Sequence, residues 1–272
     1  MGRIRGMGFA LALAALAAGC QSTQTTEAGA VGVERRQSML VSSEDINRAA
    51  DEAYRETLGE ANKKGLLNKD PATLARVRGI AQRLIATTAA FRPDAPAWKW
   101  ETNVITSKDV NAWCMPGGKI AVYTGLIERL KATDDELAAV MGHEIAHALR
   151  EHGRERASQA IAQQVILDVV TVVAGLPEGT QDLSRTVLDL TFNLPNSRTH
   201  ETEADRIGVE LAARAGYDPR AAISLWRKMQ GLGGGEPPQF LSTHPSHATR
   251  IEDLEKYSER VLPLYEATRK TR

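Results

Sequence analysis

Apolar residues recur at helical spacing in the middle of the chain. From Leu137 to Ala148 they return every three to four positions, as on one face of a helix. Just ahead of this stretch, Thr133 and Glu136 have the spacing of a capping box, in which two side chains satisfy free amides at a helix start. The pattern predicts a buried or half-buried helix of about four turns beginning at Thr133.

Three further segments have helical patterns. A capping aspartate followed by proline opens an amphipathic helix over residues 70–90, and the same pair opens a helix from Asp218 to Gly231. A Gly- and Pro-rich loop follows at residues 232–238. Residues 158–175 form a long apolar helix interrupted by three polar side chains. These polar residues favour a buried or partner-facing helix over a membrane span.

A short stretch before the central helix alternates as a strand does. Residues 119–123 are rich in β formers, and Pro116, Gly117 and Gly118 form a turn ahead of them. Residues 109–124 are therefore predicted to form a β-hairpin. With the helices, this hairpin predicts an α+β fold that is mostly helical and carries a small β-sheet.

The first residues have the pattern of an export signal. Two arginines precede an apolar run that ends in small residues, so residues 1–19 are predicted to be a signal peptide. Cys20 follows Ala-Gly and resembles the lipidated cysteine of a bacterial lipoprotein, although Ala17 stands where that motif usually has Leu. By the same resemblance, Gln21 favours sorting to the outer membrane. Residues 20–44 are polar and Gly-rich, which predicts a flexible tether.

Composition narrows the function classes. Residues 45–265 are enough for one large domain, and no internal repeat is present. The formal net charge is zero, so no nucleic-acid partner is expected. Of the two cysteines, Cys114 has no disulfide partner once Cys20 is lipidated, and we expect it to be a small buried apolar residue.

The central helix carries the sequence His-Glu-Ile-Ala-His at residues 143–147. Because positions i and i+4 share one helix face, His143 and His147 can bind one metal ion. Glu144 lies roughly 100° around the helix, where it can act as a general base towards a metal-bound water. This arrangement implies peptide-bond hydrolysis. Two surface histidines beside a solvated Glu are the alternative, and the apolar surroundings disfavour it.

A catalytic zinc site needs a third protein ligand and one open position. His152 does not fit the HExxHxxGxxH pattern, because Arg150 occupies the glycine position and His152 comes one residue too early. Glu201 is the better candidate, since Asp205, one turn later, can bond the far nitrogen of a ligand imidazole. We expect Glu203 to be a solvated charge. No role is assigned to the other histidines, His152, His200 and His247.

Several strings resemble the HExxH zinc metallopeptidase family that includes HtpX, the CAAX prenyl protease and the periplasmic proteases BepA and LoiP. The resemblance spans residues 45–260 and rests on four motifs. The first two are the zinc motif at residues 143–147 and the third-ligand segment, Ser197-Arg198 with Glu201 and Ala204-Asp205. The others are the strand pair beside the cleft, at Asn111-Ala112, residues 116–120 and residues 123–126, and a late motif, His244-Pro245-Ser246 with Arg250. It implies a catalytic His244 that stabilises the oxyanion or closes the water position at rest. Arg250 would help to position His244.

Together these observations predict a gluzincin-like zincin domain with its sheet beside the active-site helix. One Zn²⁺ would be held by His143, His147 and Glu201 with water in the fourth place. Glu144 would act first as base and then as the acid that protonates the leaving amine. The hairpin either binds substrate backbone along its edge or is an ordinary part of the sheet.

We expect an endopeptidase anchored to the outer membrane through Cys20 and facing the periplasm. Its substrates would be unfolded, misfolded or stalled envelope proteins. The alternative is an outer-membrane assembly chaperone or scaffold with a latent protease site, acting with the assembly machinery. The intact Glu144 argues against that alternative. A purely structural zinc site is disfavoured by the mixed His, His and Glu ligand set.

Overall fold

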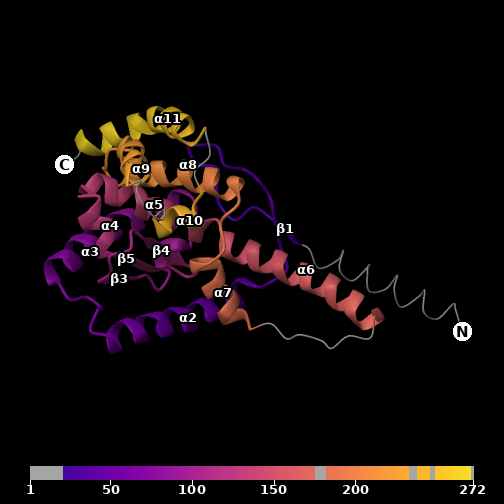
Figure 1. The fold of residues 1–272 in the computed structure, drawn as a ribbon. Helices are drawn as coiled ribbons and strands as arrows, with labels where there is room; N and C mark the ends of the chain where they lie inside the picture. Colours follow the sequence, from indigo (N-terminus) through magenta and orange to yellow (C-terminus); the bar gives the residue numbers. More distant parts are fainter. Residues whose placement is uncertain (1–20, 175–181, 233–237, 246–248, 271–272) are drawn as a thin grey trace, which may run out of the picture.

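Helices dominate the described part of the protein and surround its three-stranded sheet (Figure 1). The computed structural model describes residues 21–174, 182–232, 238–245 and 249–270. Its helices are α2 (Ser43–Lys63), α3 (Pro71–Ile85), α4 (Thr124–Arg129), α5 (Asp134–Leu149), α6 (His152–Ala174), α7 (Leu183–Phe192), α8 (Arg198–Arg214), α9 (Ala221–Gly231), α10 (Gln239–Thr243) and α11 (Arg250–Lys270), with 3₁₀ turns η1 (Thr88–Ala90) and η2 (Ala95–Ala97). The predicted α+β, mostly helical class is confirmed.

The main sheet has three strands. β3 (Glu101–Ile105) runs parallel to β5 (Lys119–Tyr123), and β4 (Ala112–Met115) runs antiparallel to β5 on its other side. Cys114 pairs with Ile120, and the turn uses Gly117 and Gly118 at φ values of +79° and +85°. The predicted hairpin is confirmed. Within the described residues, β4 pairs with β5 alone and forms one edge of this sheet.

Helix α5 is the central element of the fold. It starts as predicted, because Glu136 N donates to Thr133 Oγ1 at 3.2 Å and Thr133 N donates to Glu136 Oε2 at 3.0 Å. Every residue from Glu136 to Leu149 is buried. Helices α3, α8 and α9 and strand β4 pack around it, so each of its faces, polar residues included, meets protein.

The backbones of α5 and α8 approach closely at two glycines. A Cβ atom at Gly208 would lie 2.8 Å from His143 N, and one at Gly142 would lie 2.9 Å from Gly208 O. No larger residue fits at this crossing without moving a helix. The close approach places Glu201, two turns before Gly208 on α8, next to the histidines of α5.

The N-terminal segment, residues 22–42, packs on the domain. β1 (Gln21–Thr23) pairs antiparallel with β2 (Gln37–Met39), and Val31 and Val33 are buried in the main core. Our prediction of a flexible tether is therefore wrong for this segment. Although the segment is polar overall, its few apolar side chains pack into a core that other elements build, and Arg35 donates hydrogen bonds to Glu203 and Glu155. Residues 1–19 and Cys20 lie outside the described residues.

Other predicted helices differ in their limits. α3 is capped as expected by Asp70, whose carboxylate accepts from Ala72 N and Thr73 N, but it ends at Ile85 instead of residue 90. α9 is confirmed up to Gly231. α6 is confirmed as a helix, whereas the expected burial of residues 164–175 and the loop at 233–237 lie outside what the structure describes. Among the described residues, no helix is long and apolar enough to span a membrane.

Candidate metal centre

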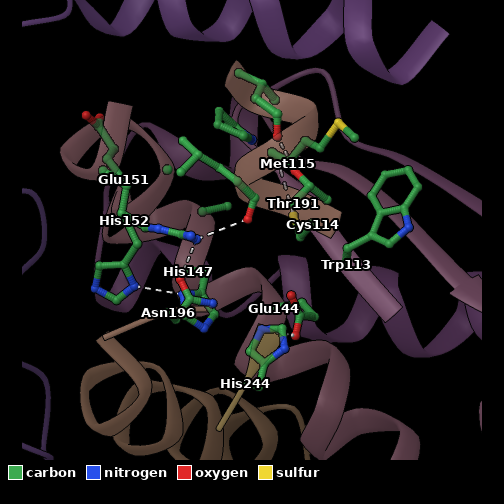
Figure 2. A pocket seen from close by; sticks show the side chains of 16 residues that line it. Trp113, Cys114, Met115, Glu144, His147, Glu151, His152, Thr191, Asn196 and His244 are labelled. Carbon is green, nitrogen blue, oxygen red and sulfur yellow. Dashed lines mark hydrogen bonds and ion pairs between the residues drawn. The ribbon is translucent and has the colours of Figure 1, made fainter. Parts of the chain in front are cut away.

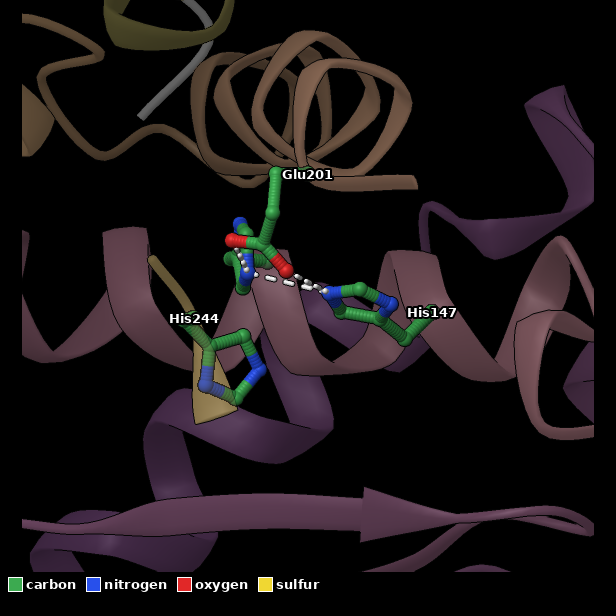
Figure 3. Close-up of side chains that lie close together, drawn as sticks. His147, Glu201 and His244 are labelled. Atoms are coloured by element: carbon green, nitrogen blue, oxygen red, sulfur yellow. Dashed lines mark hydrogen bonds and ion pairs between the residues drawn. The ribbon is translucent and has the colours of Figure 1, made fainter. Parts of the chain in front are cut away.

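Four buried side chains converge where α5, α8 and α10 meet. His143 and His147 come from α5, Glu201 from the first turn of α8, and His244 from the residue after α10. One ligand atom from each lies within 4.8 Å of all the others. Glu201 reaches from α8 towards His147, and His244 lies on the opposite side of the group (Figure 3). The structure thus brings together the three predicted metal ligands and a fourth potential ligand.

The spacing of these atoms suits a divalent metal ion. The two Nε2 atoms of His143 and His147 are 3.1 Å apart, and the Glu201 oxygens lie 3.6 Å and 3.4 Å from them, respectively. A tetrahedral ion with bonds of 2.0–2.1 Å keeps its ligands about 3.3 Å apart. Glu201 Oε1 is also buried and has no hydrogen-bond partner in the described part of the chain, a deficit that a bound cation would relieve. The donor set therefore fits such an ion.

Asp205 bonds the far side of His143, as predicted. Its Oδ1 lies 2.9 Å from His143 Nδ1, while His143 Nε2 faces the metal centre. Burial alone would raise the pKa of Asp205, but the Arg250 guanidinium and His143 outweigh it and hold that pKa below its ordinary value. Asp205 is therefore ionised at neutral pH and can fix the orientation of the His143 ring.

Arg250 contacts the carboxylates of the centre. It is 1% exposed, donates from Nη1 to Glu201 Oε2 and from Nη2 to Asp205 Oδ1, both at 2.7 Å, and stacks on the Trp226 ring at 3.5 Å. We expected Arg250 to position His244. Among the residues that the structure describes, its hydrogen bond near His244 goes to the Pro245 carbonyl, at 3.3 Å. Its main contacts instead neutralise two buried carboxylates.

Glu144 lies in the same buried region. Its Oε1 is 3.4 Å from His244 Nε2 and has no hydrogen-bond partner among the described residues. Burial raises the pKa of Glu144 well above its ordinary value, and the Glu201 carboxylate adds to the effect. A carboxyl group whose pKa is raised is a stronger base than an ordinary carboxylate, which favours the uptake and later release of a proton by a general acid–base catalyst.

His244 is held in place by stacking. Its ring lies on Phe240, with centroids 4.2 Å apart and planes 14° apart, and Thr243 Oγ1 is 3.0 Å from Nδ1. Burial lowers the pKa of His244 well below its ordinary value, so the ring is neutral. His244 is 5% exposed, so it is not a surface loop residue.

A cavity opens beside Glu144 and His147 (Figure 2). Edge strand β4 forms one wall and α7 forms another, through Val187 and Leu190. Cys114 lines this cavity and is partly buried against the main core, so the expected small buried apolar residue is met only in part. The cavity joins Glu144 to the edge of β4 that pairs with no other strand of the described residues, an arrangement that suits a cleft for an extended peptide.

Sequence reasoning missed a second polar layer behind the centre. Glu203 was expected to be solvated, but it is 6% exposed and accepts hydrogen bonds from Arg35, Arg150 and His152. His152 and His200, to which no role was assigned, are also buried. The expectation for Glu203 was wrong because the N-terminal segment and α6 cover that face of α8. The even spacing of Glu201, Glu203 and Asp205 was the one available signal.

Comparison with known proteins agrees with this geometry. The model of peptidase family M48 matches residues 71–258. The chain is 37% identical to "Mitochondrial metalloendopeptidase OMA1" of Schizosaccharomyces pombe over 82% of its own length and 64% of that protein. It is 25% identical to "Metalloprotease LoiP" of Escherichia coli over 93% of its own length and 96% of that protein. It is 26% identical to "Metalloprotease YcaL" of the same bacterium over 89% of its own length and 92% of that protein. The chain therefore belongs to peptidase family M48.

Proposed function

We propose that the protein is a zinc-dependent endopeptidase. The observation that carries this proposal is the convergence of His143, His147 and Glu201, with an unpaired buried oxygen on Glu201, next to the buried carboxyl of Glu144. Membership of a peptidase family and the names of the relatives, which are metallopeptidases, support the same activity. When bound, Zn²⁺ would make the attacking water more acidic and stabilise negative charge on the substrate carbonyl.

The chain's own residues would handle the protons. Glu144 takes a proton as water attacks the peptide carbonyl and then delivers it to the nitrogen of the leaving amine. Neutral His244, 3.4 Å from Glu144, can donate from Nε2 to the developing oxyanion. Asp205 and Arg250 keep His143 and Glu201 in position.

We infer that β4 binds the substrate as an added strand. Its outer edge borders the cavity at Glu144, and its other edge pairs with β5. Main-chain hydrogen bonds to that edge would hold an extended peptide without reading much of its sequence. Such binding suits unfolded segments, because a folded chain does not offer a free strand. Unfolded or misfolded polypeptides are therefore the proposed substrate class.

The proposed location is the periplasmic face of the outer membrane. It rests on the predicted signal peptide at residues 1–19 and on Cys20 as a lipidated anchor. Relatives include two Escherichia coli metalloproteases as well as proteins named as mitochondrial, so the compartment is proposed from the N-terminal sequence and not from the family. Misfolded or stalled envelope proteins would be the substrates there.

A holding function with a latent protease site is the second candidate. The observation that favours it is His244, whose ring lies among the potential metal ligands and would close the water position. In that state the protein would bind outer-membrane polypeptides, with the assembly machinery as partner, and would seldom cut them. Both candidates use the same edge strand, so only catalysis separates them.

The test compares wild type with Glu144→Gln on the same purified samples. Metal content is measured by mass spectrometry, and cleavage is measured on casein as an unfolded substrate. We expect one zinc in both proteins and cleavage by the wild type alone, because the amide cannot take the proton. Undiminished cleavage by Glu144→Gln would refute the mechanism. Zinc in both without cleavage in either, together with rescue of an envelope-defective deletion strain by Glu144→Gln, would favour the holding function.

A further inference from the structure

The strongest unexplained feature is the buried polar layer behind His147. We propose that His152 and Glu203 position the metal ligand His147, and that Arg35 of the N-terminal segment completes this unit. The proposal rests on the proposed metal site, because it concerns how one of its ligands is held.

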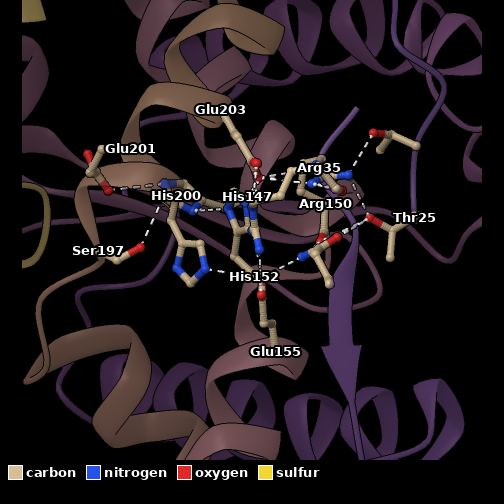
Figure 4. A network of polar contacts seen from close by, with 12 residues as sticks. Thr25, Arg35, His147, Arg150, His152, Glu155, Ser197, His200, Glu201 and Glu203 are labelled. Atoms are coloured by element: carbon tan, nitrogen blue, oxygen red, sulfur yellow. Dashed lines mark hydrogen bonds and ion pairs between the residues drawn. The ribbon is translucent and has the colours of Figure 1, made fainter. Parts of the chain in front are cut away.

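The two nitrogens of His147 face different partners. Nε2 points into the metal centre, 3.1 Å from His143 Nε2 and 3.4 Å from Glu201 Oε1. Nδ1 points the other way and lies 2.9 Å from His152 Nδ1 (Figure 4). The far nitrogen of His152, Nε2, lies 2.9 Å from Glu203 Oε2. These contacts form one continuous chain from the metal centre to a carboxylate.

Hydrogen-bond chemistry gives this chain a direction. An imidazole that binds a metal through Nε2 is neutral and keeps its hydrogen on Nδ1. That N–H of His147 must donate to His152 Nδ1, which leaves the hydrogen of His152 on Nε2. This second N–H then donates to Glu203. Each ring is therefore restricted to one tautomer, and Glu203 is the group that fixes both.

The two metal-binding histidines are supported in parallel ways. His143 donates directly to Asp205, at 2.9 Å, whereas His147 reaches Glu203 through one intervening imidazole. Carboxylates behind ligand histidines orient the ring and make it a stronger ligand. Both histidines of the HExxH motif are thus backed by a carboxylate of α8, Asp205 for His143 and Glu203 for His147. Glu201, which precedes both on α8, faces the metal centre.

Arg35 joins this unit to the N-terminal segment. It donates from Nε to Glu203 Oε1 at 2.6 Å, and its two terminal nitrogens donate to Glu155 at 2.7 and 2.8 Å. Glu155 also accepts from His200, whose ring stacks on His152 with centroids 4.3 Å apart. Arg35 therefore restrains Glu203 directly and His152 through its stacking neighbour. Arg150, which donates to Glu203 from within α5's C-terminal turn, provides a second cation.

The chain offers matched controls for Glu203 and Arg35. Glu210 lies on the same helix as Glu203, is fully buried and also holds the N-terminal segment, by accepting from Val31 N at 3.0 Å, but has no histidine partner. Arg36 is the exposed neighbour of Arg35 and bonds only Ser22 in the described structure. Substitutions at these positions disturb the same segment without touching the chain that ends on His147.

The test measures zinc affinity by competition with a chelator and the visible absorption spectrum of the Co²⁺-substituted protein. We expect zinc binding to weaken about 10- to 100-fold in His152→Leu, about tenfold in Glu203→Gln and severalfold in Arg35→Gln. Glu210→Gln and Arg36→Gln should stay within about twofold of wild type on the same reasoning. The Co²⁺ spectrum should change in the first group only, because the orientation of His147 changes there.

A conservative variant separates positioning from general stability. In His152→Gln the amide oxygen can accept from His147 and the amide nitrogen can donate to Glu203, so most of the affinity lost in His152→Leu should return. Equal losses of zinc affinity in Glu203→Gln and Glu210→Gln would overturn the proposal. Zinc affinity that stays at the wild-type value in both His152→Leu and His152→Gln would overturn it too. A different outcome combines the expected differences in zinc affinity among the variants with a zinc-bound wild type that fails to cleave casein. That result would refute the proposed endopeptidase activity and support the positioning role.

Discussion

The glycine crossing of α5 and α8 makes Gly208→Ala a sensitive probe of the metal centre. The new Cβ atom would lie 2.8 Å from His143 N and 2.9 Å from His143 Cα, whereas ordinary contacts of such atoms begin at 3.4 Å. Both neighbouring atoms are backbone, so no side chain can turn away. The helices must separate by about 0.6 Å, the difference between these distances.

A shift of this size matters more to the metal than to the fold. Gly208 lies two turns after Glu201 on the same helix face, so the displacement carries the Glu201 carboxylate away from His143 and His147. Metal–ligand distances tolerate about 0.2 Å, so we expect zinc affinity to fall at least tenfold. Overpacking costs about 1–3 kcal/mol of unfolding free energy, and the better helix propensity of Ala returns about 1 kcal/mol. The net loss of stability should be about 1 kcal/mol.

The assay is chelator competition for zinc, with urea unfolding of the metal-free protein measured in parallel. Gly79→Ala is the control, since Gly79 lies inside α3 and a Cβ atom there would meet nothing within 4 Å. It should gain up to about 1 kcal/mol and leave zinc affinity unchanged. Gly208→Ala protein that binds zinc as tightly as wild type would refute the claim that this crossing sets the distance between the ligand helices.

Three more outcomes follow from the structure. Arg250→Gln leaves Glu201 and Asp205 buried without their cation, and we expect about 3–5 kcal/mol less unfolding free energy in urea titrations; a loss below about 1 kcal/mol would contradict this. Zinc at 100 times its dissociation constant should stabilise the wild type by about 2.7 kcal/mol, a gain that EDTA abolishes and that His147→Ala should lack. Burial alone would raise the pKa of Glu136, but bonds from Lys228, the Thr133 amide and Ser224 outweigh it and hold that pKa below its ordinary 4.5. The stabilisation by ionised Glu136 is therefore present above pH 4.5 and is lost as the pH falls further. Glu136→Gln should make the unfolding free energy fall less steeply at acid pH. An unchanged slope of unfolding free energy against pH would contradict this prediction.

The local parts of the site were predictable from sequence because helical geometry fixes them. The spacing of His143 and His147 needs only a helix, and the cap at Thr133 starts that helix in the right place. The hairpin was predictable because its turn glycines and its alternation are also local. Choosing Glu201 over Glu203 was harder, since both lie on α8. The crossing at Gly208 turns Glu201 towards the metal centre, and that crossing depends on packing over 60 residues of sequence.

The polar layer was not predictable because its members come from three distant parts of the chain. Glu203 looks like a solvated helix charge as long as nothing covers its face of α8. Burial of a carboxylate is favourable only if cations and donors accompany it, and these are Arg150, Arg35 and His152. Periodicity within one helix carries no information about such partners. A buried network of this kind becomes visible only with the tertiary fold.

The N-terminal segment shows why composition misjudged the limits of the domain. A segment with few apolar residues cannot build a core of its own, which is the argument for a flexible tether. It can still cover a core that other elements build, and Val31 and Val33 do this while Arg35 supplies charge to Glu203 and Glu155. Gly29, at a φ of +61°, lets the backbone pass against Phe91, where a side chain would clash. The packed unit therefore includes residues well before 45, and the support of the metal centre extends into them.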